Sequence, residues 1–308
     1  MLAPGGELEE PSELASMAIQ SRQLYSTFIR ELERESGLPI DFQELGALDL
    51  AYSVEGWTAL EARAAKQSVM GIASQLVTPG HVATFWPRVR GEGLIGARFY
   101  PGDGLVNPRE VVAALMAVCR NLGVRLVENC EVLHVSDRNV GVEITTGRGT
   151  ETHQVALIAS GAWSGSIAVN SLPIPASWPV RGHLLGYRQP AHTCHTIIRH
   201  GHTYLMQRAG GMLIAGTSVE HAGFDRRVDA QIVSRLSSAA GFVMPHLLET
   251  SPTETWVGFR PASEHLQLGR WQSGNLYLAY GHYRNGILLA PLTADRLAAE
   301  ISASLETR

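Results

Sequence analysis

Residues 275–301, NLYLAYGHYRNGILLAPLTADRLAAEI, combine an apolar strand pattern, a short glycine-bearing turn and an apolar helix pattern in direct succession. The spacing predicts a buried strand over 275–281 and a helix from about residue 285 to residue 303. Such a turn places the backbone N–H groups of the first helical turn at the edge of a sheet, where they suit an electron-rich ring carbonyl or a carboxylate. Arg284 lies in this turn, and composition alone leaves open whether it is a structural charge or a functional one.

The other elements follow from the spacing of apolar residues and from capping residues. The pattern predicts helices over 10–36, 55–75, 107–123 and 229–245. It predicts strands over 46–53, 124–128, 131–135, 141–146, 155–160 and 253–259, with hairpin-like strands between 180 and 219. Strands 124–128 and 155–160 are apolar enough to be central strands of a covered sheet. The chain is therefore expected to fold as α/β, with an antiparallel domain inserted in pieces.

Composition narrows the class of protein. The 308 residues are 45% hydrophobic and 18% charged, which is typical of a soluble globular protein of two domains. A net charge of −4 gives no basic field for nucleic acid, and no apolar run approaches the length of a membrane helix. Three cysteines without a CxxC pair, and an extended MLAPGGELEEPSE start without a signal peptide, indicate a cytoplasmic location.

Three motifs that could carry chemistry are better explained as ordinary structure. The GxGxxG at 91–96 is followed by ARFYPGDG, which forbids the helix that a phosphate-binding turn requires. GAWSG (161–165) lacks the spacing of a serine hydrolase elbow. A zinc site is disfavoured because strand alternation separates the candidate ligands, which are His192, Cys194, His195, His200 and His202. No metal site is expected.

The segment GHYRNGILLAP (281–291) closely resembles the C-terminal flavin motif of the glycine oxidases in the D-amino-acid oxidase superfamily. Four more segments resemble that family in order, namely MLAPGGE (1–7), GALDLAYS (46–53), VALIASGAWSG (155–165) and WVGFRPAS (256–263). The resemblance spans essentially the whole chain. It implies a Rossmann-like FAD-binding α/β domain over 1–38, 101–166 and 259–308. Interleaved with it would be a substrate domain with an antiparallel or mixed sheet, over 39–100 and 167–258.

The resemblance also implies site residues. Tyr204 and Arg260 match residues that bind the substrate carboxylate, and Arg284 matches an arginine close to both substrate and flavin. Val219 stands where a methionine often lines the substrate pocket, which leaves the preferred amine open. The positions expected to line FAD are Val132, Ala159, Ser160, Gly161 and Trp163 at the adenine and ribose end, and Gly281, Asn285, Gly286, Ile287 and Leu288 at the isoalloxazine.

The implied activity is FAD-dependent oxidation of glycine, or a similar small amino acid or amine, to an imine. Dioxygen would be the acceptor and hydrogen peroxide a product, and the imine would serve thiamine thiazole synthesis. Oxidation of sarcosine or a D-amino acid, by an oxidase or a dehydrogenase, is the alternative within enzymes. The oligomeric state stays open, a homo-oligomer included.

Family members begin with a strand, a GxGxxG turn and a helix, whereas Met1 matches a position inside the loop that follows that unit. The FAD-binding domain is therefore expected to be incomplete. A late start or truncation is favoured, because Tyr204, Arg260, Arg284 and the glycines of the flavin turn are all retained. The competing hypothesis is a flavin-free, non-catalytic remnant that binds a small carboxylate.

Overall fold

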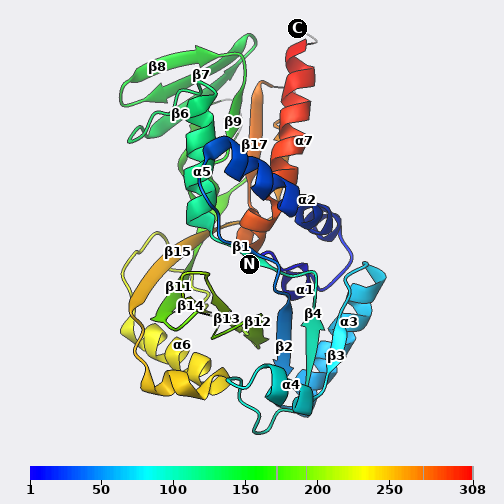
Figure 1. The fold of residues 1–308 in the computed structure, drawn as a ribbon. Helices are drawn as coiled ribbons and strands as arrows, with labels where there is room; N and C mark the ends of the chain where they lie inside the picture. The colour runs from blue at the N-terminus through cyan, green and yellow to red at the C-terminus, as the bar shows by residue number, and fades with distance from the viewer. Residues whose placement is uncertain (171–172, 192, 273, 307–308) are drawn as a thin grey trace.

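The computed structural model describes residues 1–170, 173–191, 193–272 and 274–306. Figure 1 shows two parts, one above the other, with the N-terminus between them and the C-terminal helix rising through the upper part. Each part is assembled from segments that are far apart in the sequence, as the mixture of colours in each part shows. The fold is mixed α/β, as predicted, with parallel and antiparallel pairs in separate sheets.

The lower part is built on an eight-stranded sheet. Only one neighbouring pair in it, β12 with β2, is parallel. In spatial order the strands are β15 (Glu254–Ser263), β11 (Ser177–Arg188), β14 (Met212–Gly216), β13 (Thr203–Gln207), β12 (Ile197–His200), β2 (Ala47–Ala51), β4 (Gly96–Tyr100) and β3 (Gln75–Val77). Helices α3 (Val54–Val69), α4 (Pro79–Phe85) and α6 (Ala230–Val243), and the 3₁₀ turn η2 (Pro245–Glu249), surround it.

The two faces of this sheet have different neighbours because alternate side chains of a strand point to opposite faces. Leu205 and Leu213 belong to a core that includes Ile232 of α6. Their neighbours Met206 and Ile214 belong to a second core, which includes residues of the long helix α2. The second face therefore looks toward the junction between the two parts of the molecule.

The upper part contains two smaller sheets and the two longest of the described helices (Figure 1). One sheet has the order β16 (Gln267–Arg270), β17 (Leu276–Tyr280) and β9 (Ala156–Ile158), with β17 parallel to β9. The other has the order β10 (Ala168–Val169), β6 (Val132–Arg138), β7 (Gly141–Thr146) and β8 (Gly149–His153). The helices are α2 (Glu13–Ser36), which packs on α5 (Pro108–Asn121) and α7 (Gly286–Glu306), with the short α1 (Pro4–Glu7) at the junction. The pair β1 (Phe42–Gln43) and β5 (Leu105–Val106) completes the described sheets.

Capping residues account for the helix ends that the sequence predicted. The Ser12 hydroxyl accepts from the Ala15 N–H at the start of α2, and Gly37 ends that helix with φ of 71°. Asn107 accepts from the Arg109 N–H ahead of Pro108, which begins α5. The predicted strand 275–281 and the helix after it are confirmed as β17 and α7, joined by the 3₁₀ turn η3 (Tyr283–Asn285).

Some expectations about local structure were wrong. Segment 124–128 forms no strand, because no strand among the described residues pairs with it. The Val124 and Val127 side chains of this segment are exposed. The opening segment was expected to be extended, but it contains α1. The structure also has strands β3, β4 and β8, which the sequence pattern did not predict. The GxGxxG at 91–96 leads into β4 rather than a helix, as expected.

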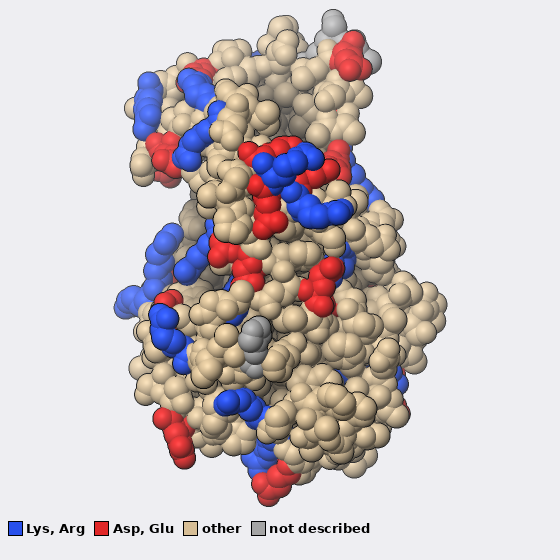
Figure 2. Space-filling view, viewed as in Figure 1, with Lys and Arg blue, Asp and Glu red and all other residues tan. Residues whose placement is uncertain are grey.

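The surface carries no single dominant sign of charge on the face drawn in Figure 2, where acidic and basic side chains are interspersed. Within the described residues, the helices are too short or too polar to cross a bilayer.

Candidate active site

Two glycines allow Tyr204 and Arg260 to lie flat on one face of the large sheet. Tyr204 pairs with Gly216 across β13 and β14, and a Cβ on Gly216 would lie 2.8 Å from the Tyr204 hydroxyl oxygen. On the neighbouring strand β11, a Cβ on Gly182 would lie 2.5 Å from Nη1 of Arg260. Both distances are too short for a real Cβ contact, so each side chain occupies space that only glycine leaves open.

Arg260 is a half-buried cation whose described contacts are to neutral oxygens. Its Nη2 donates to the Thr217 hydroxyl at 2.7 Å, and its Nη1 donates to the Ser218 carbonyl at 3.2 Å. No carboxylate of the described residues forms an ion pair with it. Burial, and then the nearby positive charge of Arg284, lower the pKa of Arg260. A half-buried cation without a carboxylate partner favours an anionic ligand.

Tyr204 lies beside this guanidinium. The Tyr204 ring covers Gly216, and Arg260 donates to Thr217, the next residue in the chain. Burial raises the pKa of Tyr204, while Arg260 and Arg284 act in the opposite direction. The hydroxyl therefore stays protonated at neutral pH and can donate to a carboxylate next to Arg260.

Arg284 comes from η3, at the start of α7, and is fully engaged by a carboxylate. Its Nε donates to Glu7 Oε2 at 2.6 Å and its Nη2 to Glu7 Oε1 at 2.9 Å, a bidentate ion pair. The hydrogen bond to Glu7 raises the pKa of Arg284. Tyr204, Arg260 and Arg284 are thus close enough to shift one another's pKa. Of the three, Arg284 alone already has a carboxylate partner among the described residues.

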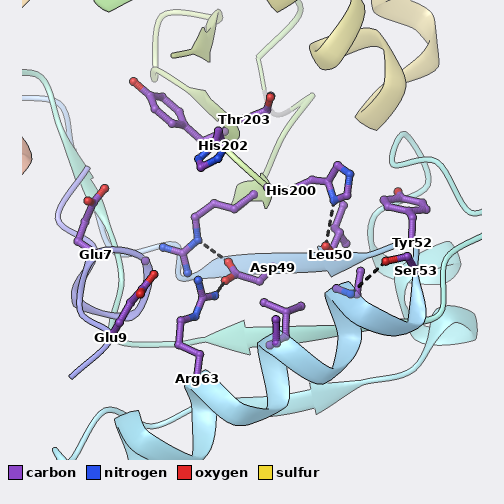
Figure 3. A pocket seen from close by; sticks show the side chains of 18 of the residues that line it. Glu7, Glu9, Asp49, Leu50, Tyr52, Ser53, Arg63, His200, His202 and Thr203 are labelled. Carbon is purple, nitrogen blue, oxygen red and sulfur yellow. Dashed lines mark hydrogen bonds and ion pairs between the residues drawn. The ribbon is translucent and has the colours of Figure 1, made fainter. Parts of the chain in front are cut away.

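Two cavities adjoin this cluster and share Met1 and Tyr204 as lining residues. We call the first the polar cavity; its volume is about 700 Å³ and its lining includes Glu7, Asp49, Arg63, Arg199, His202 and Arg284. We call the second the apolar cavity, after the part of its wall that lies against the sheet and α7; its volume is about 810 Å³. That wall includes Met206, Met212, Ile214, Trp256 and Ile287, and the rest of the lining includes the charged residues Asp41, Arg109, Glu110, Arg208 and Glu254. Figure 3 shows the polar cavity, with Glu7 and Glu9 at one end and Tyr52 and Ser53 at the other.

A chain of alternating charges forms the floor of the polar cavity. Asp49 of β2 pairs with Arg63 of α3 and with Arg199 of β12 (Figure 3). Arg199 also donates from Nη1 to Asp103 at 2.7 Å, and Asp103 accepts from the Gly5 N–H of α1 at 2.9 Å. Asp49 and Asp103 are buried, so each needs its partners to offset the cost of desolvation.

The residues predicted for the isoalloxazine gather at the end of β17 and the start of α7. Gly281 has φ of 85°, and Ile287 lines the apolar cavity. Leu288 is buried in the core, and Gly286 begins α7. Oδ1 of the buried Asn285 has no hydrogen-bond partner among the residues that the structure describes. Asn285 lines neither cavity, but Arg284 on one side of it lines the polar cavity and Ile287 on the other lines the apolar cavity. An unpartnered acceptor at this helix N-terminus fits a polar aromatic ring that carries an N–H donor, which is the chemistry of a flavin.

The residues predicted for the adenine and ribose end are not brought together around a large cavity. Ala159 and Ser160 are exposed just after β9, and Gly161 begins the 3₁₀ turn η1 (Gly161–Ser166). Trp163 is exposed and stacks on Phe224, with ring centroids 5.2 Å apart. Val132 is half-buried at the start of β6, and none of the five lines the polar or the apolar cavity. This end of the expected cofactor site is open.

Other sequence candidates lie elsewhere. Val219 is exposed and lines neither cavity. His200 contacts the Leu50 carbonyl oxygen through Nδ1, whereas the Cys194 thiol donates to the Thr196 carbonyl. His192 lies outside the described residues.

Sequence reasoning missed Gly182, Gly216 and the role of Glu7. Glu7 lies within the MLAPGGE segment of the family resemblance, but its distance of 277 positions from Arg284 hides the pairing. The sequence alone gives no signal for the two glycines, because the side chain opposite each of them is known only once the strand register is known.

The chain matches known proteins over nearly all of its length. It is 32% identical to a glycine oxidase of Geobacillus kaustophilus over 312 aligned positions, which cover 100% of this chain and 82% of that protein. A crystal structure of glycine oxidase from the same species aligns with a TM-score of 0.92 at 30% identity, covering 98% of this chain and 82% of that one.

A bifunctional ThiO/ThiG protein of Synechocystis is 30% identical over 96% of this chain, which spans only 43% of that longer protein. The structure of an L-proline dehydrogenase from P. horikoshii shares the fold, with a TM-score of 0.82 at 21% identity. The family model described as FAD dependent oxidoreductase (DAO) matches residues 1–300. The chain therefore belongs to the DAO family of FAD-dependent oxidoreductases, the superfamily that its flavin-turn sequence resembles.

Proposed function

We propose that this enzyme oxidises glycine, or a similar small amino acid or amine, with FAD as cofactor. The observation that carries the proposal is Arg260, a half-buried cation without a carboxylate partner among the described residues, with the Tyr204 hydroxyl beside it. Together they match a substrate carboxylate in charge and in hydrogen-bonding capacity. Similarity to glycine oxidases over the whole chain supports glycine as the substrate.

The reaction converts glycine, water and dioxygen into glyoxylate, ammonia and hydrogen peroxide. Bound FAD supplies the hydride acceptor and the reaction with dioxygen. Arg260 and Tyr204 hold the carboxylate, which fixes the position of the α-carbon. Gly281, Asn285, Gly286, Ile287 and Leu288 would hold the isoalloxazine, and Ile287 would contribute to the wall of the apolar cavity. The adjoining sheet face excludes water with apolar side chains such as Met206 and Ile214.

The proposal extends to domains and setting. Residues 1–38, 101–166 and 259–308 would form the FAD-binding domain, and 39–100 with 167–258 the substrate domain. Strand β15 runs across the 258/259 boundary and lies wholly in the large sheet, so Arg260 would be counted with the FAD-binding domain while its guanidinium lies over Gly182 of the substrate-domain sheet. In the cytoplasm the imine product would serve thiamine thiazole synthesis, a setting supported by the ThiO/ThiG relatives.

One observation favours a second candidate. The exposure of Ala159, Ser160 and Trp163 is what a flavin-free protein that binds a small carboxylate would show. Such a protein would use Arg260 and Tyr204 without performing oxidation.

Absorption spectra and a peroxide assay separate the two candidates. The purified chain, incubated with FAD and desalted, should retain flavin absorption and produce peroxide from glycine more efficiently than from sarcosine or D-alanine. Arg260→Ala should raise the KM for glycine by about 10- to 100-fold, because a charge-assisted hydrogen bond contributes about 1.5–3 kcal/mol. Arg120→Ala, on the exposed surface of α5, is the matched control and should leave the KM unchanged. Absence of flavin uptake would overturn the enzyme proposal for this chain.

A further inference from the structure

Glu7 is the carboxylate that pairs with Arg284 at the polar cavity. Its carboxylate takes both Nε and Nη2 of Arg284, and both residues line the polar cavity. The other two arginines of that cavity, Arg63 and Arg199, pair with Asp49. Each arginine lining the polar cavity thus has a carboxylate partner, and Arg260, outside it, has none among the described residues.

We propose that Glu7 is a specificity-determining residue which masks Arg284 and so restricts the enzyme to substrates with a single carboxylate. The inference rests on the proposed function, because it takes Arg260 and Tyr204 as the site of the first carboxylate. Because Tyr204 lines the polar cavity, a substituent on the amine of a substrate held by Tyr204 can extend into that cavity. A second carboxylate on that substituent meets Glu7 and finds no free guanidinium, so like-charge repulsion and desolvation oppose its entry.

The backbone around Glu7 is fixed, which keeps the mask in place. The Gly5 N–H donates to Asp103, and Gln67 donates from Nε2 to the Gly5 and Leu8 carbonyls at 2.8 and 2.7 Å. A Cβ on Gly6 would collide with the Arg199 guanidinium, so α1 packs directly on that side chain. These contacts position α1 without involving the Glu7 carboxylate, which leaves that carboxylate free to serve Arg284.

Two N-substituted glycines provide matched probes. Sarcosine carries an N-methyl group, whereas iminodiacetate carries an N-carboxymethyl group with a second negative charge. Calorimetric titration of both compounds, and of glycine, into the wild-type chain and Glu7→Gln gives a selectivity ratio for each protein. Glu7→Gln keeps the size of the side chain and removes its charge. Glu10→Gln is the control. It removes one negative charge three positions along the chain from Glu7, and the Glu10 carboxylate pairs with Lys66, outside the cavity.

In Glu7→Gln, the affinity ratio of iminodiacetate to sarcosine should rise by about tenfold or more, the value of one charge-assisted hydrogen bond. In Glu10→Gln it should stay within about twofold of the wild-type ratio. An unchanged ratio in Glu7→Gln, or an equal rise in Glu10→Gln, overturns the proposal, as does failure of every variant to bind iminodiacetate. If Glu7→Gln does not fold, Glu7→Asp replaces it, because the shorter aspartate side chain cannot keep the bidentate pair with Arg284. The affinity ratio of iminodiacetate to sarcosine should then rise by a smaller factor. An unchanged ratio in Glu7→Asp would overturn the proposal.

The titration also separates this proposal from the proposed function. If the chain binds glycine but produces no peroxide, the oxidase proposal fails while the selectivity ratio still decides the role of Glu7. If peroxide forms and the ratio does not change, only the role of Glu7 is rejected.

Discussion

The space over Gly182 offers a direct test of how the Arg260 guanidinium is positioned. A Cβ at residue 182 would lie 2.5 and 2.6 Å from the two terminal nitrogens of Arg260 and 2.8 Å from Cζ. Since non-bonded carbon and nitrogen atoms approach to about 3.5 Å, Gly182→Ala must displace the guanidinium by about 1 Å. A displacement of that size at a substrate-positioning group costs on the order of 10- to 100-fold in binding or catalysis.

Gly258 provides the matched control, because it pairs with Gly182 across β11 and β15 and a Cβ there meets nothing within 4 Å. We expect Gly182→Ala to raise the KM for glycine by about 10- to 100-fold. Gly258→Ala should leave it near the wild-type value. Both variants should melt within a few degrees of the wild-type chain, because the group displaced is the flexible end of a side chain. Equal KM values for the two variants would refute the assignment of Arg260 as the carboxylate-binding residue in this geometry.

Three further predictions concern other parts of the site. Tyr204→Phe should raise the KM for glycine by about tenfold, through loss of one hydrogen bond to a charged group, with little change in flavin absorption; an unchanged KM would remove the hydroxyl from the site. Asp49→Asn should lower the free energy of unfolding by about 3–5 kcal/mol, because it removes the carboxylate that Arg63 and Arg199 share. Urea denaturation measures this loss, and a loss below about 1 kcal/mol would contradict this account. Burial lowers the pKa of His282 to about 4, so the unfolded chain binds more protons than the folded chain between about pH 4 and 6.5. Stability should therefore fall as pH drops through this window, by up to about 1.4 kcal/mol per pH unit, and His282→Asn should show a flatter profile in urea titrations.

Local signals in the sequence predicted the elements whose ends are set by neighbouring residues. Asn107 and Pro108 mark the start of α5, and Gly37 marks the end of α2, because capping depends on residues within one helical turn. The strand and helix of 275–301 follow from apolar spacing that changes from strand to helical period at Gly281. For these elements, local propensity and capping residues were sufficient to predict the secondary structure.

Elements that depend on a distant partner could not be predicted in this way. Segment 124–128 has an apolar pattern as strong as that of β9, but a strand also requires a neighbour to accept its hydrogen bonds. Strand β8 is exposed and polar, and only its pairing with β7 makes it a strand. A single-sequence pattern contains no information about either partner.

The same distinction between local and long-range information applies to the residues of the candidate site. Tyr204, Arg260 and Arg284 were identified by resemblance, and their roles as substrate-binding residues stay predictions. The ion pair between Glu7 and Arg284 joins two ends of the chain, and the glycines under Tyr204 and Arg260 depend on the register of four strands, β13 with β14 and β11 with β15. Long-range pairing therefore supplied what the linear sequence could not.

The alternating charges of Arg63, Asp49, Arg199 and Asp103 also have an evolutionary consequence. Each of the four side chains neutralises its neighbours. A single replacement during evolution would therefore leave a buried charge without a partner and destabilise the protein until a second replacement follows. We expect the four positions to covary among homologues, with the whole set either retained or exchanged for apolar side chains of similar volume. Since Asp103 also holds the Gly5 N–H, such an exchange would alter the segment that bears Glu7. Substrate range and core composition would then drift together, although the residues concerned lie on four separate segments of the chain.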